Sequence, residues 1–344
     1  MAYKQYPKPL SEKTLQKKYA ELGLSDEKLS FLKQFILACT NLYGRITIGD
    51  IWEVYKKLGG MTAVPQIKRV DILRISDVLR RDELPYLVFE IDEIYTEEPR
   101  KELSREFVSK YLVGQGPGKF ATYYYVAEAQ SYHEYYVPQN LLSFVNMPVP
   151  KQEKDLLNFV GKLKVTADKY EDRYGHVVEC SGRKGRTLDS FSFMNQMEVF
   201  EYQYAKGEIN GKEKPKEAQR LLAESNSMTE AEKIVDRIKW YINIGHVSST
   251  KMVQYTLDEI GEAGVQLTKK QVEKLIQGIM DMNNYSHLMC TGGWRPVDLA
   301  KNSPMPSTIT FGPGVRQAIA EGKLDEKELV KAINAMGMDV EMGH

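Results

Sequence analysis

Apolar side chains recur at helical spacing through the N-terminal part of the chain. They predict one helix from Leu29 to Tyr43 and, after a short extended segment at Ile46–Thr47, a second helix that ends at Gly59–Gly60. A third helix is predicted from about Pro65 to Arg81. We expect Trp52, on the apolar side of the second helix, to be buried against the first and third helices.

The pattern changes after Pro85. "YLVFEIDEIY" (86–95) is rich in β-branched and aromatic residues and largely alternating, which predicts a strand with Glu90 and Asp92 on its solvent face. "KFATYYYVAEA" (119–129) predicts a second strand, and "RKELSREFVSKYLV" (100–113) between them predicts a helix. The order of helix, short strand, two helices and strands is typical of a winged helix, although the insertion between the strands is longer than usual.

A proline-containing charged segment, "MPVPKQEKDLL" (147–157), is the best candidate for a domain boundary. The sequence therefore predicts a polar N-terminal arm (1–25), a winged-helix-like domain with strands (26–148) and a mainly helical domain (149–344). The predicted fold class is mainly α with a small β component (α+β). Thr229 with Glu232 and Thr268 with Gln271 are predicted capping boxes. The helices predicted after the boundary are 151–163, 188–206, 214–225, 229–244, 249–263, 268–284, 313–321 and 325–336.

The stretch "MNNYSHLMCTGGWRPVDLAKN" (282–302) gathers residue types that are common in functional sites. Its asparagines suit the end of a helix, Gly292-Gly293 suits a turn, and Pro296 suits the start of the short helix "VDLAKN". Trp294 is large enough to anchor the turn against a core. We interpret this stretch as a structural connection between helices.

Composition limits the classes of function. The chain of 344 residues carries 47 basic and 47 acidic side chains, a formal net charge of zero, whereas proteins that coat nucleic acid are usually basic. No apolar run approaches the ~20 residues that cross a bilayer, and the first residues hold no apolar signal-peptide core. We therefore expect a cytoplasmic protein without membrane association.

No motif in the sequence indicates a metal or a cofactor. The three cysteines and five histidines never approach zinc-ligand spacing, so neither a disulfide framework nor a metal is expected, and no cofactor is predicted. "GQGPGKF" (114–120) is one residue short of a phosphate-binding loop and joins the wrong elements, so we interpret it as a turn. His133 lacks the second histidine of a zinc-protease helix, because position 137 is Val137.

Two basic clusters could contact phosphates. The third helix carries Lys68, Arg69 and Arg74. The acidic Asp71 and Asp77 on the same helix weaken the interpretation as a nucleic-acid site, so a protein partner is supported nearly as well as a nucleic acid. The loop "ECSGRKGRTLD" (179–189) carries the second cluster, and a solvated loop is its simpler interpretation. This second cluster consists of Arg183, Lys184 and Arg186.

Three stretches resemble a family of uncharacterised proteins from Gram-positive bacteria, many of which end in a SEC-C zinc motif. Residues 282–302 are similar to their "Asn-Asn-Thr-Arg…Trp…Gly-x-Thr-Pro-x-Glu-Leu" segment. "LYGRITIGDIWEVY" (42–55) resembles their N-terminal helix pair, and "EYYVPQNLLSFV" (134–145) their "Tyr-Tyr-Ile-Pro…Glu-Leu-Leu" segment. This chain has Ser286-His287 in place of Thr-Arg and lacks the cysteine cluster in "MGMDVEMGH". The resemblance therefore implies neither the zinc function nor any catalytic residue.

These observations favour a non-enzymatic, macromolecule-binding protein with a regulatory or adaptor role, its partner being either a nucleic acid or a protein. The alternative is an enzyme whose site is assembled from distant histidine and acidic residues. The candidates for such a site are His133, Glu134, His176 and Asp172.

Overall fold

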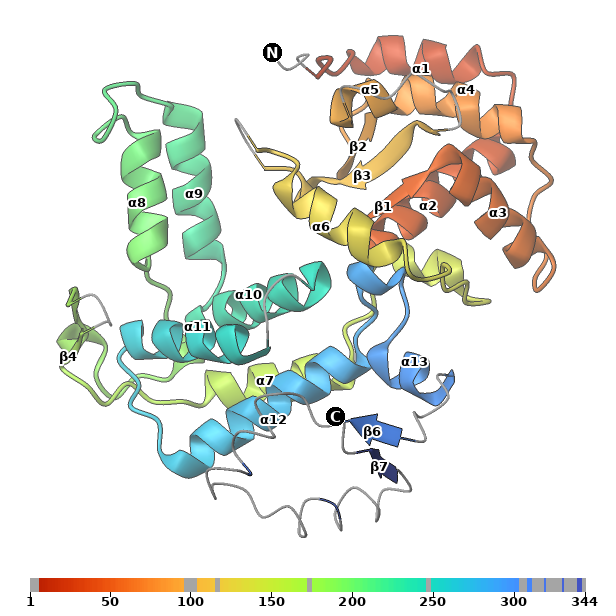
Figure 1. The fold of residues 1–344 in the computed structure, drawn as a ribbon. Coiled ribbons are helices and arrows are strands. Elements are labelled where there is room, and N and C mark those ends of the chain that lie inside the picture. The colour runs from red at the N-terminus through yellow and green to blue at the C-terminus, as the bar shows by residue number, and fades with distance from the viewer. Residues whose placement is uncertain are drawn as a thin grey trace. The chain divides into compact units, whose positions relative to one another are not determined.

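A computed structural model describes residues 6–95, 104–114, 118–171, 175–245, 249–302, 308–310, 319, 330 and 339–341, called the described residues below (Figure 1). The chain forms two compact units, Met1–Pro296 and Val297–His344. In the second unit, β6 (Thr308–Thr310) pairs in parallel with β7 (Asp339–Glu341). The helices predicted at 313–321 and 325–336 lie outside the described residues apart from two single positions.

The first half of the larger unit combines helices with a small antiparallel sheet. The strands lie in the order β1-β3-β2, so the last of these three strands along the chain is the central one. A mainly helical fold with a small sheet was predicted and is confirmed. The elements are α1 (Glu12–Ala20), α2 (Asp26–Tyr43), β1 (Arg45–Thr47), α3 (Ile48–Gly59), α4 (Arg69–Leu79), β2 (Tyr86–Phe89), α5 (Ile91–Ile94) and β3 (Glu106–Ser109).

Local signals place the helix ends. The Ser25 hydroxyl accepts a hydrogen bond from the Lys28 amide at the start of α2, and Gly44 ends that helix with φ 73°. The Thr47 hydroxyl accepts a bond from the Asp50 amide at 3.0 Å and starts α3 directly after β1. Because one face of each helix is apolar, α2 and α3 bury their side chains in one core with α4 and the sheet.

The predicted polar arm belongs to this core. Helix α1 packs against α4 and buries Leu15 and Tyr19 (Figure 1). The Tyr19 hydroxyl donates to a carboxylate oxygen of Asp82 at 2.6 Å, and Arg74 of α4 donates to the main-chain carbonyl of Glu21 at 3.3 Å. Helix α4 is therefore flanked by α1 on its outer side.

Two segments differ from their predicted structure. The predicted strand 119–129 is helix α6 (Ala121–Gln130), which buries Tyr123, Val126 and Gln130 at helical spacing. The predicted helix 100–113 contains β3, whose Phe107 pairs with both β1 and β2. A central strand is buried on both faces, so apolar and polar residues do not alternate along it. The pairing of β3 with its neighbours in the sheet also overrides the local preference of this segment for a helix.

Two side chains also depart from expectation. Glu90 does not face solvent but is 5% exposed and accepts a bond from Arg105 at 2.5 Å, because the chain turns into α5 directly after β2. Trp52 is partly exposed and stacks on Tyr55 with ring centroids 5.2 Å apart. The expected full burial of Trp52 is therefore wrong.

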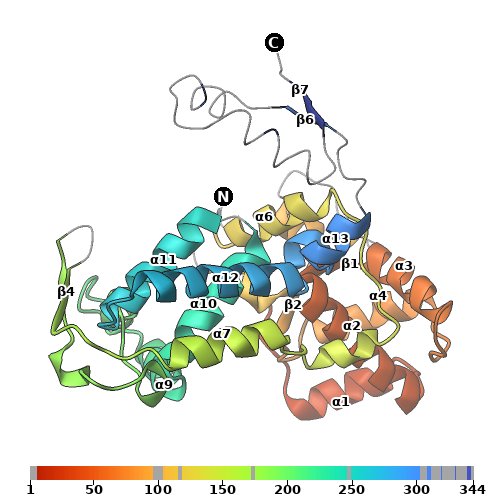
Figure 2. The same cartoon turned by 90° about the horizontal axis from the view of Figure 1, so that it is seen from below.

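The second half of the larger unit is mainly helical. Helices α7 and α12 lie side by side in both views (Figures 1 and 2), and Figure 1 shows α10 and α11 above them. The predicted helices 151–163, 214–225, 229–244, 249–263 and 268–284 are confirmed to within a few residues, whereas 188–206 is helical mainly at 196–205. The elements are α7 (Lys151–Gly161), β4 (Lys169–Glu171), β5 (Val177–Glu179), α8 (Gln196–Ala205), α9 (Pro215–Ser227), α10 (Glu230–Ile244), α11 (Ser249–Glu262) and α12 (Lys269–Tyr285), whereas α13 (Pro296–Asn302) begins at the last residue of this unit.

Buried apolar side chains form three clusters. The first extends from Leu15 to Phe144 along the sequence and the second from Leu156 to Cys290. A third includes Tyr123 of α6 and Ile244 of α10, which belong to different halves of the unit. The domain boundary predicted at residues 148 and 149 stays a prediction.

The glycine-rich stretch after α12 is a structural connection, as interpreted from the sequence. Gly292 and Gly293 have φ angles of 63° and 85°, which form the turn. The Trp294 indole donates to the main-chain carbonyl of Glu134 at 2.8 Å, and its ring lies 4.8 Å from that of Tyr136. The Nδ1 atom of His287 lies 2.7 Å from the Gly293 carbonyl oxygen and helps to hold the turn.

Candidate functional site

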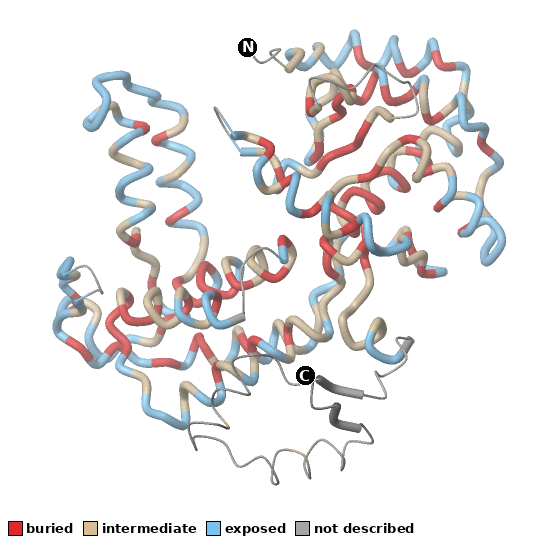
Figure 3. Tube along the Cα trace, in the orientation of Figure 1, coloured by how far each residue is buried: buried red, intermediate tan, exposed pale blue. Residues whose placement is uncertain are grey.

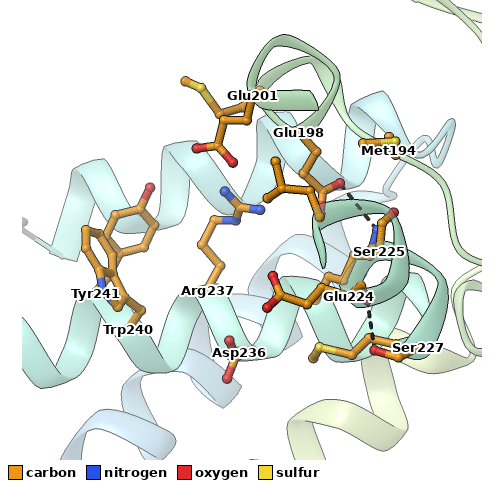
Figure 4. Close-up of a pocket in the computed structure, with 14 residues that line it drawn as sticks. Met194, Glu198, Glu201, Glu224, Ser225, Ser227, Asp236, Arg237, Trp240 and Tyr241 are labelled. Carbon is orange, nitrogen blue, oxygen red and sulfur yellow. Dashed lines mark hydrogen bonds and ion pairs between the residues drawn. The ribbon is translucent and has the colours of Figure 1, made fainter. Parts of the chain in front are cut away.

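A cleft of about 600 Å³ opens between the α8–α9 helical hairpin and α10, and we call it the α8–α10 cleft (Figure 4). Its walls combine apolar side chains with carboxylates. The lining residues are Met194, Met197, Glu198, Glu201, Leu221, Glu224, Ser225, Ser227, Met228, Lys233, Asp236, Arg237, Trp240 and Tyr241.

Capping interactions fix the helices that form the cleft. At the start of α8, the Asn195 side chain accepts from the Glu198 amide and the Glu198 carboxylate accepts from the Asn195 amide, each at 2.9 Å. Thr229 and Glu232 form the predicted capping box at the start of α10, and Pro215 is the first residue of α9. The capping boxes at Thr229 and Thr268 are therefore confirmed.

Lys233 ties the base of the cleft together. Its side chain is 7% exposed and its ammonium donates to the Phe193 carbonyl at 2.7 Å, to the Ser225 hydroxyl at 2.9 Å and to Glu198 at 3.3 Å. An ammonium has three donors, so all of them are used. Lys233 therefore joins α8, α9 and α10 and has no donor left for a ligand.

A second cation, Arg237, extends from α10 into the cleft between Glu201 and Asp236 (Figure 4). Its Nε atom lies 2.7 Å from a carboxylate oxygen of Glu259 on α11. Burial and neighbouring carboxylates, including Glu230, raise the pKa of Glu259 to about 8, and Arg237 offsets only part of that rise. The Nε of Arg237 is therefore held by Glu259 below the cleft.

The rim of the cleft is acidic. Glu224 pairs with Arg220 at 2.6 Å on the exposed side of α9, whereas Glu201 and Asp236 form no ion pair among the described residues. Burial raises the pKa of the Asp236 carboxyl, and the charges of nearby basic side chains offset this only in part. Glu201 and Asp236 are thus carboxylates of the rim without an ion pair among the described residues.

The hairpin that forms one wall exposes many large apolar side chains. Among the ten residues of α8 only Ala205 is buried, and most of the hairpin surface is exposed or half-buried (Figure 3). Six of the sixteen exposed large apolar residues among those described belong to this hairpin, which is a marked concentration. They are Met197, Val199, Phe200, Tyr204, Ile209 and Leu222. Met197, Phe200 and Tyr204 follow helical spacing and form one stripe beside the cleft.

The first basic cluster lies on and just before α4. Lys68, Arg69 and Arg74 are exposed, but Arg74 is held by the Glu21 carbonyl. Arg80 and Arg81, at the end of the same helix, are bound to Glu93 and to the Lys8 carbonyl. Lys68 and Arg69 are therefore the cations of this cluster whose side chains make neither a hydrogen bond nor an ion pair among the described residues.

The second basic cluster is held in place by its own part of the fold. Arg183 donates to the Glu262 carbonyl at 3.1 Å and lies 4.0 Å above the Phe193 ring. Lys184 pairs with Asp168 at 2.9 Å, and Arg186 donates to the Ser190 carbonyl. The hairpin of β4 beside this loop and helix α4 lie at opposite ends of the larger unit (Figure 1), so the two clusters do not form one surface.

The candidate catalytic residues are not brought together. His133 and Glu134 are exposed after α6, and Glu134 pairs with Lys57 at 3.1 Å, whereas His176 lies in the β4–β5 hairpin. Asp172 lies outside the described residues. No group of metal-ligating side chains that could hold an ion occurs in the part of the chain that is described. No helix in that part combines the length and apolar character needed to cross a membrane.

The cleft was not found from the sequence. The stripe of Met197, Phe200 and Tyr204 was visible as a helical pattern within 188–206, but such a pattern usually indicates a face that packs on the core. Only the structure shows that α8 packs against α9 and leaves this face uncovered.

No family model matches the chain, and neither a curated protein nor a solved structure matches it. The resemblance to proteins with a SEC-C motif therefore stays a prediction.

Proposed function

We propose that this chain is a non-enzymatic adaptor or regulatory protein that binds another protein at the α8–α10 cleft. The observation that carries this proposal is the uncovered apolar stripe of α8 beside a cleft of about 600 Å³. Apolar surface of this kind costs free energy in water and is typical of protein interaction sites. A cytoplasmic location is part of the same proposal.

We also infer that residues 26–148 form a winged-helix-like domain. The order α2, β1, α3, α4, β2, β3 and the sheet order β1-β3-β2 support this inference. In helix-turn-helix domains, the helix at the position of α4 enters the major groove of DNA. Nucleic-acid binding through Lys68, Arg69 and Arg74 is therefore the second candidate function.

The contacts of α4 favour the protein partner over the nucleic acid. Helix α1 packs against α4, and Arg74 is already bound to the Glu21 carbonyl. Asp77 lies on the same helix, bound to Arg105 at 2.7 Å. Few cations of α4 are thus available to phosphates, and a net charge of zero provides no general attraction.

Affinity capture with matched variants tests the proposal. The tagged full-length protein would be recovered from extracts of its source cells with and without nuclease, as wild type, Met197→Glu and Met280→Glu. Met197 and Met280 are methionines of similar exposure, 59% and 51%, but Met280 lies on α12 away from the cleft. We expect protein partners that resist nuclease, are lost with Met197→Glu and are retained with Met280→Glu.

The opposite result would identify the second candidate function. Partners that disappear after nuclease treatment and are unaffected by Met197→Glu would contradict protein binding at the cleft. Binding of DNA or RNA that weakens steeply with salt, and weakens further in Lys68→Ala/Arg69→Ala, would then support α4 as the binding surface.

A further inference from the structure

We propose that the α8–α10 cleft is specific for a cationic amphipathic segment of its partner, one that presents lysine or arginine beside large aliphatic side chains. This inference rests on the proposed protein-binding function and adds the chemical class of the partner. It follows from the apolar lining of the cleft together with the charges on its rim.

The apolar part of the cleft suits flexible aliphatic side chains. Met194, Met197 and Met228 line it together with Leu221 and Trp240. Methionine has an unbranched, polarisable side chain that adapts to different shapes, and methionine-rich surfaces are common where proteins bind helical segments. The stripe of α8 extends this surface beyond the cleft itself.

The charges of the cleft do not balance within the protein. Four carboxylates and two cations line it, Lys233 donates to three acceptors, and the Nε of Arg237 lies 2.7 Å from Glu259 below the cleft. Glu201 and Asp236 are left without an ion pair among the described residues. An ammonium or guanidinium group of the partner at this rim would gain a carboxylate partner in either of them, and beside Asp236 it would offset the desolvation that raises the pKa of that carboxyl.

The same charges argue against two other occupants. In a symmetric contact between two copies of the chain, the α8 surface would face its own equivalent and bring Glu201 close to acidic side chains of the second copy. A nucleic acid would bring phosphates toward Glu201, Glu224 and Asp236. Both arrangements place like charges against each other in a partly desolvated cleft, which is unfavourable.

Three synthetic peptides test the inference by fluorescence anisotropy with the full-length protein. Each is an amphipathic helix with leucine at the same positions, and its polar positions are all lysine, all glutamine or all glutamate. The protein variants are wild type, Glu201→Gln/Asp236→Asn and the control Glu128→Gln/Glu273→Gln. The control removes the same number of carboxylates from exposed positions that do not line the cleft.

We expect wild type to bind the lysine peptide about tenfold more tightly than the glutamine peptide, and the glutamate peptide most weakly. The cleft variant should lose most of this preference while the control keeps it, and added salt should reduce it. Equal binding of all three peptides would overturn the cationic class but leave the protein-binding function standing. An equal loss of the preference in the control variant, or no binding of any peptide, would also overturn the inference. The affinity capture with Met197→Glu tests the proposed protein-binding function independently of these peptides.

Discussion

Arg45 and Glu106 form a two-point ion pair beside the β1–β3 ladder, with Nη2 2.5 Å from Oε1 and Nε 3.1 Å from Oε2. Glu106 is 2% exposed and also accepts a bond from the Tyr123 hydroxyl of α6 at 2.6 Å. One buried carboxylate therefore connects the sheet to α6. Its charge is tolerated because both oxygens have donors.

Removal of Arg45 should destabilise the larger unit strongly. In Arg45→Ala the Glu106 carboxylate stays buried without its counter-charge, and we expect a loss of about 3–5 kcal/mol in the free energy of unfolding. The double variant Arg45→Ala/Glu106→Gln should lose less than the sum of the single changes, because the uncompensated charge is gone. Urea unfolding followed by circular dichroism measures both effects.

The matched control is the exposed pair of Lys57 and Glu134, whose side chains are 53% and 86% exposed. Lys57→Ala should change stability by no more than about 0.5 kcal/mol. Equal losses for Arg45→Ala and Lys57→Ala would show that Glu106 is hydrated in solution and not buried.

Two glycines with positive φ separate backbone strain from steric crowding. Gly23 and Gly293 have φ angles of 67° and 85°, but a Cβ at Gly23 meets nothing within 4 Å, whereas one at Gly293 would lie 2.9 Å from Leu42 and 3.0 Å from Tyr43. Gly23→Ala should therefore cost about 1–2 kcal/mol from strain alone. Gly293→Ala should cost clearly more, because α2 and the turn must move apart. Similar shifts of the melting temperature in both variants would contradict this close packing.

Helical periodicity in the sequence was sufficient to predict a helix where a segment packs one face on a core. The predicted α10 and α12 have apolar stripes and capping boxes, and both signals lie within a few residues of each other in the sequence. The same approach failed for β3, because Phe107 is placed by Ile46 and Val88, which are distant in the chain. The three consecutive tyrosines that begin with Tyr123 favour a strand locally, yet burial at helical spacing made that segment α6.

For the candidate sites, too, the sequence indicated some features but not others. The sequence identified the cations of the 181–187 loop but not their partners, because the Glu262 carbonyl that holds Arg183 lies 79 positions away in the chain. The acidic rim of the cleft depends on Glu201 of α8 and Asp236 of α10. Nothing in the sequence distinguishes these two acidic residues from the others on the same helices. Only the arrangement of three helices makes them neighbours of one cavity.

Glu230 should make stability depend on pH. This residue is 2% exposed, and burial, with a smaller contribution from Glu198, raises the pKa of its carboxyl from 4.5 to about 7, although Lys233 offsets part of the rise. Between these two values the folded protein holds a proton that the unfolded chain has released. Stability should therefore be greatest below about pH 4.5 with respect to this group, and should fall as pH rises through about 7.

The variant Glu230→Gln should remove this contribution, because glutamine resembles the protonated acid at every pH. Its melting temperature should exceed that of wild type above pH 7, and the difference should shrink toward pH 5. Glu273→Gln, an exposed position on α12, should keep the wild-type profile. A Glu230→Gln profile parallel to that of wild type would show that Glu230 ionises normally.

The loop cations provide the last test, because Arg183 and Lys184 are adjacent but differently held. Arg183 bonds to the Glu262 carbonyl at 3.1 Å and stacks on Phe193, whereas Lys184 forms a pair with Asp168 in which the side chains are 52% and 63% exposed. We expect Arg183→Ala to cost about 1–3 kcal/mol of stability, since hydrogen bonds from charged groups are strong and the carbonyl loses its charged donor. Lys184→Ala should be nearly neutral.

These expectations differ from those of a phosphate-binding loop. If the loop bound nucleic acid, replacement of Arg183, Lys184 and Arg186 by alanine would weaken DNA or RNA binding and reduce its salt dependence, because each lost contact releases fewer counterions. A salt titration of DNA and RNA binding by wild type and the triple variant distinguishes a structural loop from a phosphate-binding loop. We expect no change in binding beyond what the loss of stability explains, because Arg183 holds the loop onto α11 and Phe193, and Arg186 lies over the Phe191 ring. A reduced salt slope in a triple variant that is folded would instead restore the loop as a nucleic-acid site.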